Sequence, residues 1–140
     1  MIHRSLPGAM ALLALLAARG EAQNSLKSRE PSFDGRSLSS WVKDLDALAP
    51  STRNAAAYAI SSMGAAAKPA VPALIHVLED QDAPATVRYP VCVALREIGP
   101  AAKEAVPALT EAMDDRNDDI ASMARQALRA ITGEDPRPSE

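Results

Sequence analysis

Few side chains in this chain could carry out acid–base or nucleophilic chemistry. The 140 residues include only two histidines, His3 near the start and His76 between Ile75 and Val77. A single histidine in the body of the chain does not supply the paired groups of a typical catalytic site, and no Gly-rich phosphate-binding loop accompanies it. We therefore interpret His76 as a surface residue and predict no catalytic residues, no cofactor and no metal site.

The segment 114–119, which reads Asp-Asp-Arg-Asn-Asp-Asp, gathers four carboxylates. Calcium binds clustered oxygen ligands, but this segment lacks the glycine and the distal glutamate of an EF-hand loop. A simpler interpretation is a turn between two helices, with Asp118 as the N-cap and the other acids stabilising the positive end of the following helix. We favour the turn over the calcium site.

The elements that would position such residues are indicated by an internal repeat. Residues 60–74 recur 35 residues later as residues 95–109. A period of this length is typical of a stack of similar units, each of which buries its apolar face only against its neighbours. Alanine is abundant and only four residues are aromatic, which favours helices over strands.

Apolar residues align at helical spacing in three successive units. The second helices share the core positions Thr52, Ala56, Ala59, Ile60 and Met63, then Val87, Val91, Ala94, Leu95 and Ile98, then Ile120, Ala124, Ala127, Leu128 and Ile131. The first helices share Leu38, Trp41 and Leu45, then Val71, Leu74 and Leu78, then Val106, Leu109 and Met113. Gly64, Gly99 and Gly133 follow the second helices, where a left-handed residue is favoured, and Ser51 is an expected N-cap. We predict an all-α fold, an α-solenoid of three helix pairs in residues 38–132.

Two residues of the middle unit conflict with a simple repeat. Pro90 lies within the second helix, where a proline costs about 3 kcal/mol. We expect the regular helix to begin late, so that Pro90 falls in its first turn; a kinked long helix is the alternative. Cys92, the only cysteine, cannot form a disulfide within the chain. Its counterparts are Ala57 and Arg125, so we expect it to be partly exposed and to behave as a small hydrophobic residue.

The first 22 residues have the layout of a secretory signal peptide. A basic start, Met1–Arg4, precedes an uncharged apolar run at 9–18, and small residues allow cleavage after Gly20 or after Ala22. A membrane anchor is the alternative, but the run is shorter than the roughly 20 residues that span a bilayer. We predict an exported protein, periplasmic or extracellular, with no membrane span once the signal is removed.

The segments on either side of the helix pairs are polar and lack a sustained period. Residues 23–37 contain turn-forming residues, and residues 133–140 contain proline and glutamate. We predict a flexible linker for the first segment and a disordered tail for the second.

The repeated residues resemble the HEAT repeats of short bacterial arrays, which also occur in phycobilisome lyases. The series of that family is matched by Val87-Arg88, Ala94-Leu95, Ile98-Gly99, Ala101 and the run 105–109, followed by Met113 and Asp115. Segment 33–41 also resembles a lead-in that precedes secreted bacterial HEAT arrays. The resemblance implies a right-handed superhelical stack whose second helices line the concave face.

The resemblance also implies a ladder between repeats. In the family, an acid in the turn and an arginine six residues later form this ladder. Asp82 and Arg88 match that spacing, and Asp46 and Arg53 nearly match it, with a separation of seven residues. Ala121 takes the arginine position in the last unit, so we expect the ladder to stop there.

One row of residues lies beside the core stripe of the second helices, and we call it the predicted row. It comprises Asn54, Ala57 and Ser61, then Tyr89, Cys92 and Arg96, then Ser122, Arg125 and Arg129. Tyrosine and arginine are enriched in interface hot spots, and such solenoids bind through their concave face. We predict partner-binding residues at Asn54, Tyr58, Tyr89, Arg96, Arg125 and Arg129, with the arginines meeting an acidic surface. The alternative is a solvated face whose arginines pair with acids of this chain.

These observations favour an exported, non-enzymatic HEAT-repeat scaffold that binds an unknown protein or peptide. The formal net charge of −3 gives no electrostatic reason to bind nucleic acid. Repeat similarity alone suggests a second hypothesis, an enzyme of the bilin-lyase type or its accessory subunit. A third is a structural remnant of a larger array.

Overall fold

The computed structural model describes residues 29–137. The chain divides into two units, residues 1–30 and 31–140, and every element described here belongs to the second. In chain order the elements are β1 (Ser32–Phe33), β2 (Arg36–Ser37), α2 (Leu38–Asp44), α3 (Pro50–Ser62), η1 (Gly64–Ala70), α4 (Val71–Glu79), α5 (Ala85–Ile98), η2 (Gly99–Ala105), α6 (Val106–Ala112) and α7 (Asp118–Thr132). The predicted signal peptide, 1–22, lies outside the described residues.

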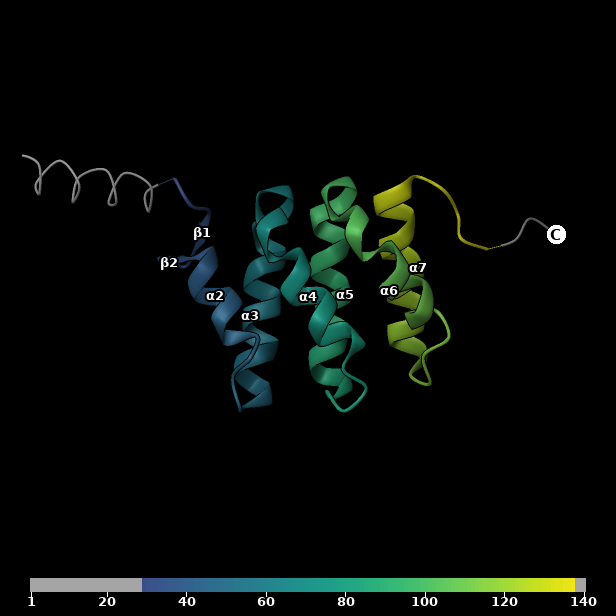
Figure 1. The fold of residues 1–140 in the computed structure, drawn as a ribbon, viewed down its shortest axis with the longest axis horizontal. Coiled ribbons are helices and arrows are strands. Elements are labelled where there is room, and N and C mark those ends of the chain that lie inside the picture. Colours follow the sequence, from purple (N-terminus) through teal and green to yellow (C-terminus); the bar gives the residue numbers. More distant parts are fainter. Residues whose placement is uncertain (1–28, 138–140) are drawn as a thin grey trace, which may run out of the picture. The chain divides into compact units, whose positions relative to one another are not determined.

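Three helix pairs, α2–α3, α4–α5 and α6–α7, stack side by side (Figure 1). The first helices lie in one layer and the second helices in the other, with α5 packed between α3 and α7. Short 3-10 segments, η1 and η2, connect one pair to the next and contain the repeated glycine–alanine stretches. This arrangement confirms the predicted all-α solenoid of three pairs, whereas the right-handed sense of the superhelix stays a prediction.

The core runs through all three pairs and consists mainly of the residues that the repeat predicts. All five predicted positions of α5 and all five of α7 are buried, as are Val71, Leu74 and Leu78 of α4. Positions near unit edges are half-buried instead, namely Trp41, Thr52, Met63, Val106 and Met113. The periodicity therefore identified the faces of the helices correctly and overestimated burial only at their margins.

The helix ends agree with the sequence at the C-termini and differ at the N-termini. Gly64, Gly99 and Gly133 all adopt positive φ, as predicted for residues that end a second helix. The N-cap of α7 is Asn117, whose Oδ1 accepts from the amides of two following residues, and not Asp118. The predicted cap Ser51 is wrong as well, because α3 begins at a proline and has no side-chain cap.

Pro90 lies inside α5 and is buried, so the prediction of a late helix start is wrong. Helix α5 starts at Ala85, five residues before the proline. Pro90 cannot donate to the carbonyl of Thr86 four residues earlier. The side chain of Asn54 in α3 donates to that carbonyl instead, from Nδ2 at 2.5 Å. The neighbouring unit thus provides the hydrogen bond that the proline removes.

Residues 31–37 differ from the predicted linker, because they form a small hairpin. Asp34 and Gly35, both at positive φ, make the turn between β1 and β2. The guanidinium of Arg36 lies 3.8 Å from the centroid of the Trp41 ring and forms an ion pair with Asp44 at 2.8 Å. Trp41 Nε1 in turn donates to the carbonyl of Phe33 at 3.1 Å. These contacts fasten the hairpin to α2, which begins directly after it.

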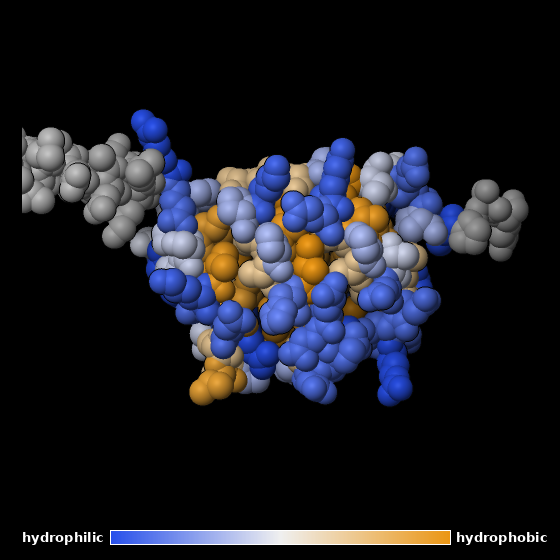
Figure 2. Space-filling model, viewed as in Figure 1, coloured by the Kyte–Doolittle hydropathy of each residue, from blue (hydrophilic) through white to orange (hydrophobic). Residues whose placement is uncertain are grey.

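The outer face of the stack at α7 and the edge formed by the turns carry different surfaces. The outer face of α7 is polar, with exposed Ser122, Arg125, Gln126 and Arg129, and no further repeat within residues 29–137 covers it. Figure 2 shows mostly hydrophilic side chains along the edge formed by the turns, with apolar surface projecting at the turn between α2 and α3. Leu48 in that turn is fully exposed. No helix within residues 29–137 is long and apolar enough to cross a membrane.

Candidate interaction surface

A groove of about 480 Å³ opens on the side of the second helices. It is lined by Asn54, Tyr58, Ala85, Thr86, Tyr89, Pro90, Asn117 and Asp119, and so involves α3, α5 and the start of α7. The structure thereby brings together three of the six predicted partner-binding residues. We call this feature the tyrosine groove.

The two tyrosines give the groove its apolar area. Tyr58 is 43% exposed, and Tyr89 is half-buried and packs against the core. Neither phenolic hydroxyl bonds to another residue within 29–137, so both are available to a partner. Asp119 is the only charged residue among those that line the groove. Aromatic area with unpaired hydroxyls is a surface chemistry common in protein interfaces.

Asn54 has a structural role that the sequence did not reveal. Its Nδ2 already donates to the Thr86 carbonyl beside Pro90. This contact joins α3 to α5 in the lining of the tyrosine groove, so Asn54 helps to shape the groove before any partner arrives. The signal was present in the sequence as a proline in a helix interior, but the compensating residue lies 32 positions before Thr86, the residue whose carbonyl it binds.

Arg96 does not present a free cation. Its guanidinium donates to Glu97 Oε1 from Nε at 3.0 Å and from Nη2 at 2.8 Å. It also reaches across to α7, where Nη1 lies 3.3 Å from Gln126 Oε1 and 3.5 Å from Met123 Sδ. These contacts bridge the second and third pairs and neutralise the charge locally.

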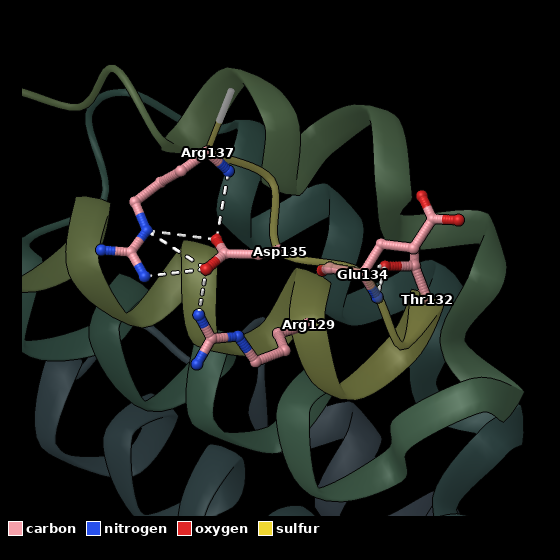
Figure 3. Close-up of polar contacts among 5 residues, drawn as sticks. All are labelled: Arg129, Thr132, Glu134, Asp135 and Arg137. Atoms are coloured by element: carbon pink, nitrogen blue, oxygen red, sulfur yellow. Dashed lines mark hydrogen bonds and ion pairs between the residues drawn. The ribbon is translucent and has the colours of Figure 1, made fainter. Parts of the chain in front are cut away.

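Arg125 and Arg129 lie on the outer face of α7, away from the groove lining. Arg125 makes no hydrogen bond or ion pair with any residue in 29–137. Arg129 pairs with Asp135, which is also held by Arg137 (Figure 3). Hydrogen bonds from Arg137 and Arg129 hold the pKa of Asp135 well below its usual range. The described part of the tail, through Arg137, is thus linked to α7 by ion pairs.

The predicted row is therefore not a continuous exposed surface. Its middle positions, Ala57 and Cys92, are fully buried, because the next second helix packs over them. In the third unit no further helix within residues 29–137 packs over the row, and the corresponding residue Arg125 reaches solvent. The row marks the face on which one unit stacks on the next.

Cys92 is fully buried in the core, so the prediction of partial exposure is wrong. Burial raises the pKa of its thiol to about 12, with Arg88 nearby opposing that shift. A thiol that is buried and protonated at neutral pH is inert toward most reagents. This agrees with the interpretation of Cys92 as a small hydrophobic residue.

Comparison with known families decides what kind of stack this is. A family model described as HEAT repeats matches residues 39–129, which cover all three helix pairs. The chain belongs to the HEAT-repeat family. Comparison with curated proteins finds no match. HEAT repeats form a scaffold of the kind that mediates protein interactions, so the fold itself supports the broad role predicted from the sequence.

The HEAT ladder between the second and third repeats is formed by Arg88 and Asp115. Arg88 Nη2 pairs with Asp115 Oδ2, and Arg88 Nε donates to the Leu78 carbonyl at 3.4 Å. Both charged side chains are buried, at 8% and 7% exposure. Arg88 therefore pairs with the acid of the next repeat, as a ladder between repeats requires, and forms no ion pair with Asp82 of its own turn.

Burial acts to raise the pKa of Asp115, but the backbone amide of Asn117 and the guanidinium of Arg88 outweigh it. The pKa of Asp115 consequently lies below its ordinary value. Asp115 and Asn117 thus have structural roles in the acidic turn 114–119, as ladder acid and helix cap. Within residues 29–137, no three His, Cys, Asp or Glu side chains are placed to hold a metal ion.

The corresponding contact between the first and second repeats is not formed. Arg53 occupies the position of Arg88, but it makes no ion pair with Asp46 or with any other residue in 29–137. Its Nε is buried and no protein acceptor lies within hydrogen-bond distance. The ion-pair ladder that the family resemblance implies thus forms between the second and third repeats but not between the first and second.

Proposed function

We propose that this chain is an exported, non-enzymatic HEAT-repeat scaffold that binds a protein or peptide segment in the tyrosine groove. The observation that carries the proposal is the groove itself, in which Tyr58 and Tyr89 from adjacent repeats flank a hollow of about 480 Å³. A hollow of this size accommodates a few side chains of a bound segment. Tyr58 is also one of three large hydrophobic residues exposed within residues 29–137.

The residues around the groove define the chemistry of the segment. The tyrosine rings favour an apolar, aromatic or proline side chain between them. Asp119 at the α7 side favours a basic group at the same end of the segment. An acidic partner for Arg96, Arg125 and Arg129 stays a prediction for a different surface, and two of these arginines already hold acids of this chain.

Export is supported by the order of residues at the N-terminus. A basic start, an apolar run at 9–18 and small residues before position 23 are the features that a signal peptidase recognises. Mass spectrometry of the protein isolated from the cell envelope should find a chain that begins at Glu21 or Gln23. A mature protein that still begins at Met1 would contradict export.

Binding in the groove can be tested with three versions of the full chain. The wild type, the double variant Tyr58→Ala/Tyr89→Ala and the control Lys103→Ala are immobilised at equal density and exposed to periplasmic extract. Lys103 is exposed in η2 and lies outside the groove lining. We expect the same captured protein with the wild type and the control, reduced at least about tenfold with the double variant, as for loss of hot-spot residues. Equal capture by all three would overturn the proposal.

A further inference from the structure

A second cavity lies at the unpaired joint between the first and second repeats. It has a volume of about 290 Å³ and is lined by residues that include Asp46, Leu48, Arg53, His76 and Asp80. It lies beside the turn between α2 and α3, and it shares no lining residue with the tyrosine groove. We call it the first-joint cavity.

The joint between the second and third repeats shows what an arginine at this position of the repeat binds. There a cavity of about 470 Å³ has Arg88 in its wall, and the guanidinium of Arg88 holds a carboxylate, that of Asp115. Its Nε also has an acceptor, the Leu78 carbonyl. Arg53 stands 35 residues earlier at the same position of its repeat, so the scaffold presents two equivalent guanidinium groups.

The protein itself supplies neither acceptor to Arg53. Asp80 is the counterpart of Asp115, since each accepts from the amide two residues later, at 3.0 and 2.9 Å. Asp80 nevertheless forms no ion pair with Arg53. Arg88 Nε finds its acceptor ten residues earlier, at the Leu78 carbonyl. No carbonyl takes that place for Arg53 Nε, which stays buried without a protein acceptor.

We propose that the first-joint cavity binds a carboxylate of a partner chain, held by Arg53. A carboxylate offers two oxygens in the plane of the guanidinium, and this geometry suits the paired Nη donors of Arg53, which, unlike Nε, are not buried. Leu48, fully exposed at the cavity, provides apolar contact for a side chain next to the carboxylate. The ligand is therefore a carboxylate flanked by an apolar group, either a chain terminus or an acidic side chain.

The other charged groups at the cavity sharpen this specificity. Asp46 and Asp80 are exposed in its lining, and the only other titratable lining residue besides Arg53 is His76. Two acids beside one arginine lower the affinity for any anion, and they penalise a ligand with more than one negative charge more than they penalise a single carboxylate. The site should thus select a single carboxylate over phosphate.

The test uses side-chain NMR of the full chain with small probes. N-acetylleucine, a terminal carboxylate beside a leucine side chain, is titrated while the Nε–Hε resonance of Arg53 is followed. N-acetylleucinamide lacks the carboxylate, acetyl-glutamyl-leucinamide carries it on a side chain, and inorganic phosphate tests charge selectivity. We expect N-acetylleucine to bind with a dissociation constant on the order of millimolar. The amide and phosphate should bind at least about tenfold more weakly. Binding of acetyl-glutamyl-leucinamide would indicate an acidic side chain as the source of the carboxylate, and binding of N-acetylleucine alone would indicate a chain terminus.

Variants separate a specific site from general attraction to arginine. Arg53→Gln should abolish the titration, and Arg53→Lys should weaken it because lysine lacks the paired donors. Arg116→Gln, which removes an exposed arginine from the third repeat, should leave binding unchanged. Equal binding to wild type and Arg53→Gln would overturn the proposal.

The chain's own Asp80 is the competing acceptor. If Asp80 closed this joint in solution, Asp80→Asn would shift the Arg53 Nε–Hε resonance in the absence of any probe, and that result would also overturn the proposal. The variant Tyr58→Ala/Tyr89→Ala should bind N-acetylleucine as the wild type does. Failure of the tyrosine groove as a docking site and failure of the first-joint cavity are therefore distinguishable.

Discussion

The two joints of this solenoid place the same residue type in the same position and use it differently. At the joint between the second and third repeats, Arg88 is buried, its Nη2 pairs with Asp115 and its Nε donates to a backbone carbonyl. At the joint between the first and second repeats, Arg53 has neither contact. The difference shows that two repeats can place the same side chain at the same position without giving it the same contacts.

The largest expected effect comes from removing the acid of the paired joint. Asp115→Ala would leave the buried guanidinium of Arg88 without its counter-ion, which costs on the order of 3 to 5 kcal/mol in the free energy of unfolding. The matched change Asp80→Ala at the unpaired joint should cost less than about 0.5 kcal/mol. Urea unfolding of both variants measures the contrast. Similar losses in the two would show that Asp80 also pairs with its arginine.

A core substitution should instead weaken both joints together. Leu95 is fully buried in α5, the helix that packs against both α3 and α7. Leu95→Ala should therefore destabilise the domain by on the order of 2 to 5 kcal/mol as a large-to-small change. Differential scanning calorimetry should still show a single transition at a lower temperature. A shift of less than a degree or two would contradict the placement of Leu95 in the core.

The hydrogen bond between Asn54 and Thr86 contributes to the unpaired joint independently of any ion pair. Asn54→Ala should cost about 1 kcal/mol, because the carbonyl beside Pro90 loses its donor. In the background of Pro90→Ala, which restores a backbone N–H, the same change should cost much less. A double-mutant cycle measured by urea unfolding tests this coupling. Additive effects of the two substitutions would show that Asn54 does not compensate for the proline.

The smallest effect is the pH dependence of the paired joint. The pKa of Asp115 in the folded protein lies below its unfolded value, so its stabilisation is present above the ordinary aspartate pKa of about 3.9. That stabilisation is lost as the pH falls through the folded-state pKa. The difference in unfolding free energy between wild type and Asp115→Asn should therefore shrink from pH 6 toward pH 3. A constant difference over this range would argue against the lowered pKa.

Much of the fold followed from periodicity. The repeat of 60–74 at 95–109 and the apolar stripes led to three helix pairs in 38–132, and the structure and the HEAT family match confirm them. Glycines at the ends of second helices were also correctly placed, because a positive φ is a local requirement that glycine meets without steric cost. These features depend on residues close together in the chain.

The candidate site was predicted only in part. Asn54, Tyr58 and Tyr89 do line one groove, whereas Arg96, Arg125 and Arg129 lie elsewhere and two of them are paired. Helical spacing places residues on a face of one helix, but it does not say whether another helix covers that face. For this reason the alternative that the arginines pair with acids of this chain describes Arg96 and Arg129 better.

Residue spacing was enough to predict the helix pairs, their core faces and their C-terminal ends, because these depend on residues within a single unit. Tertiary structure alone decided that Cys92 is buried, that Asn54 bonds to the carbonyl beside Pro90, and that Arg88 pairs with the acid of the following repeat. The two hydrogen-bonded contacts join one repeat to the next across 32 and 27 positions of the chain. These contacts and the burial of Cys92 depend on how the units stack on one another, which no local pattern of residues encodes.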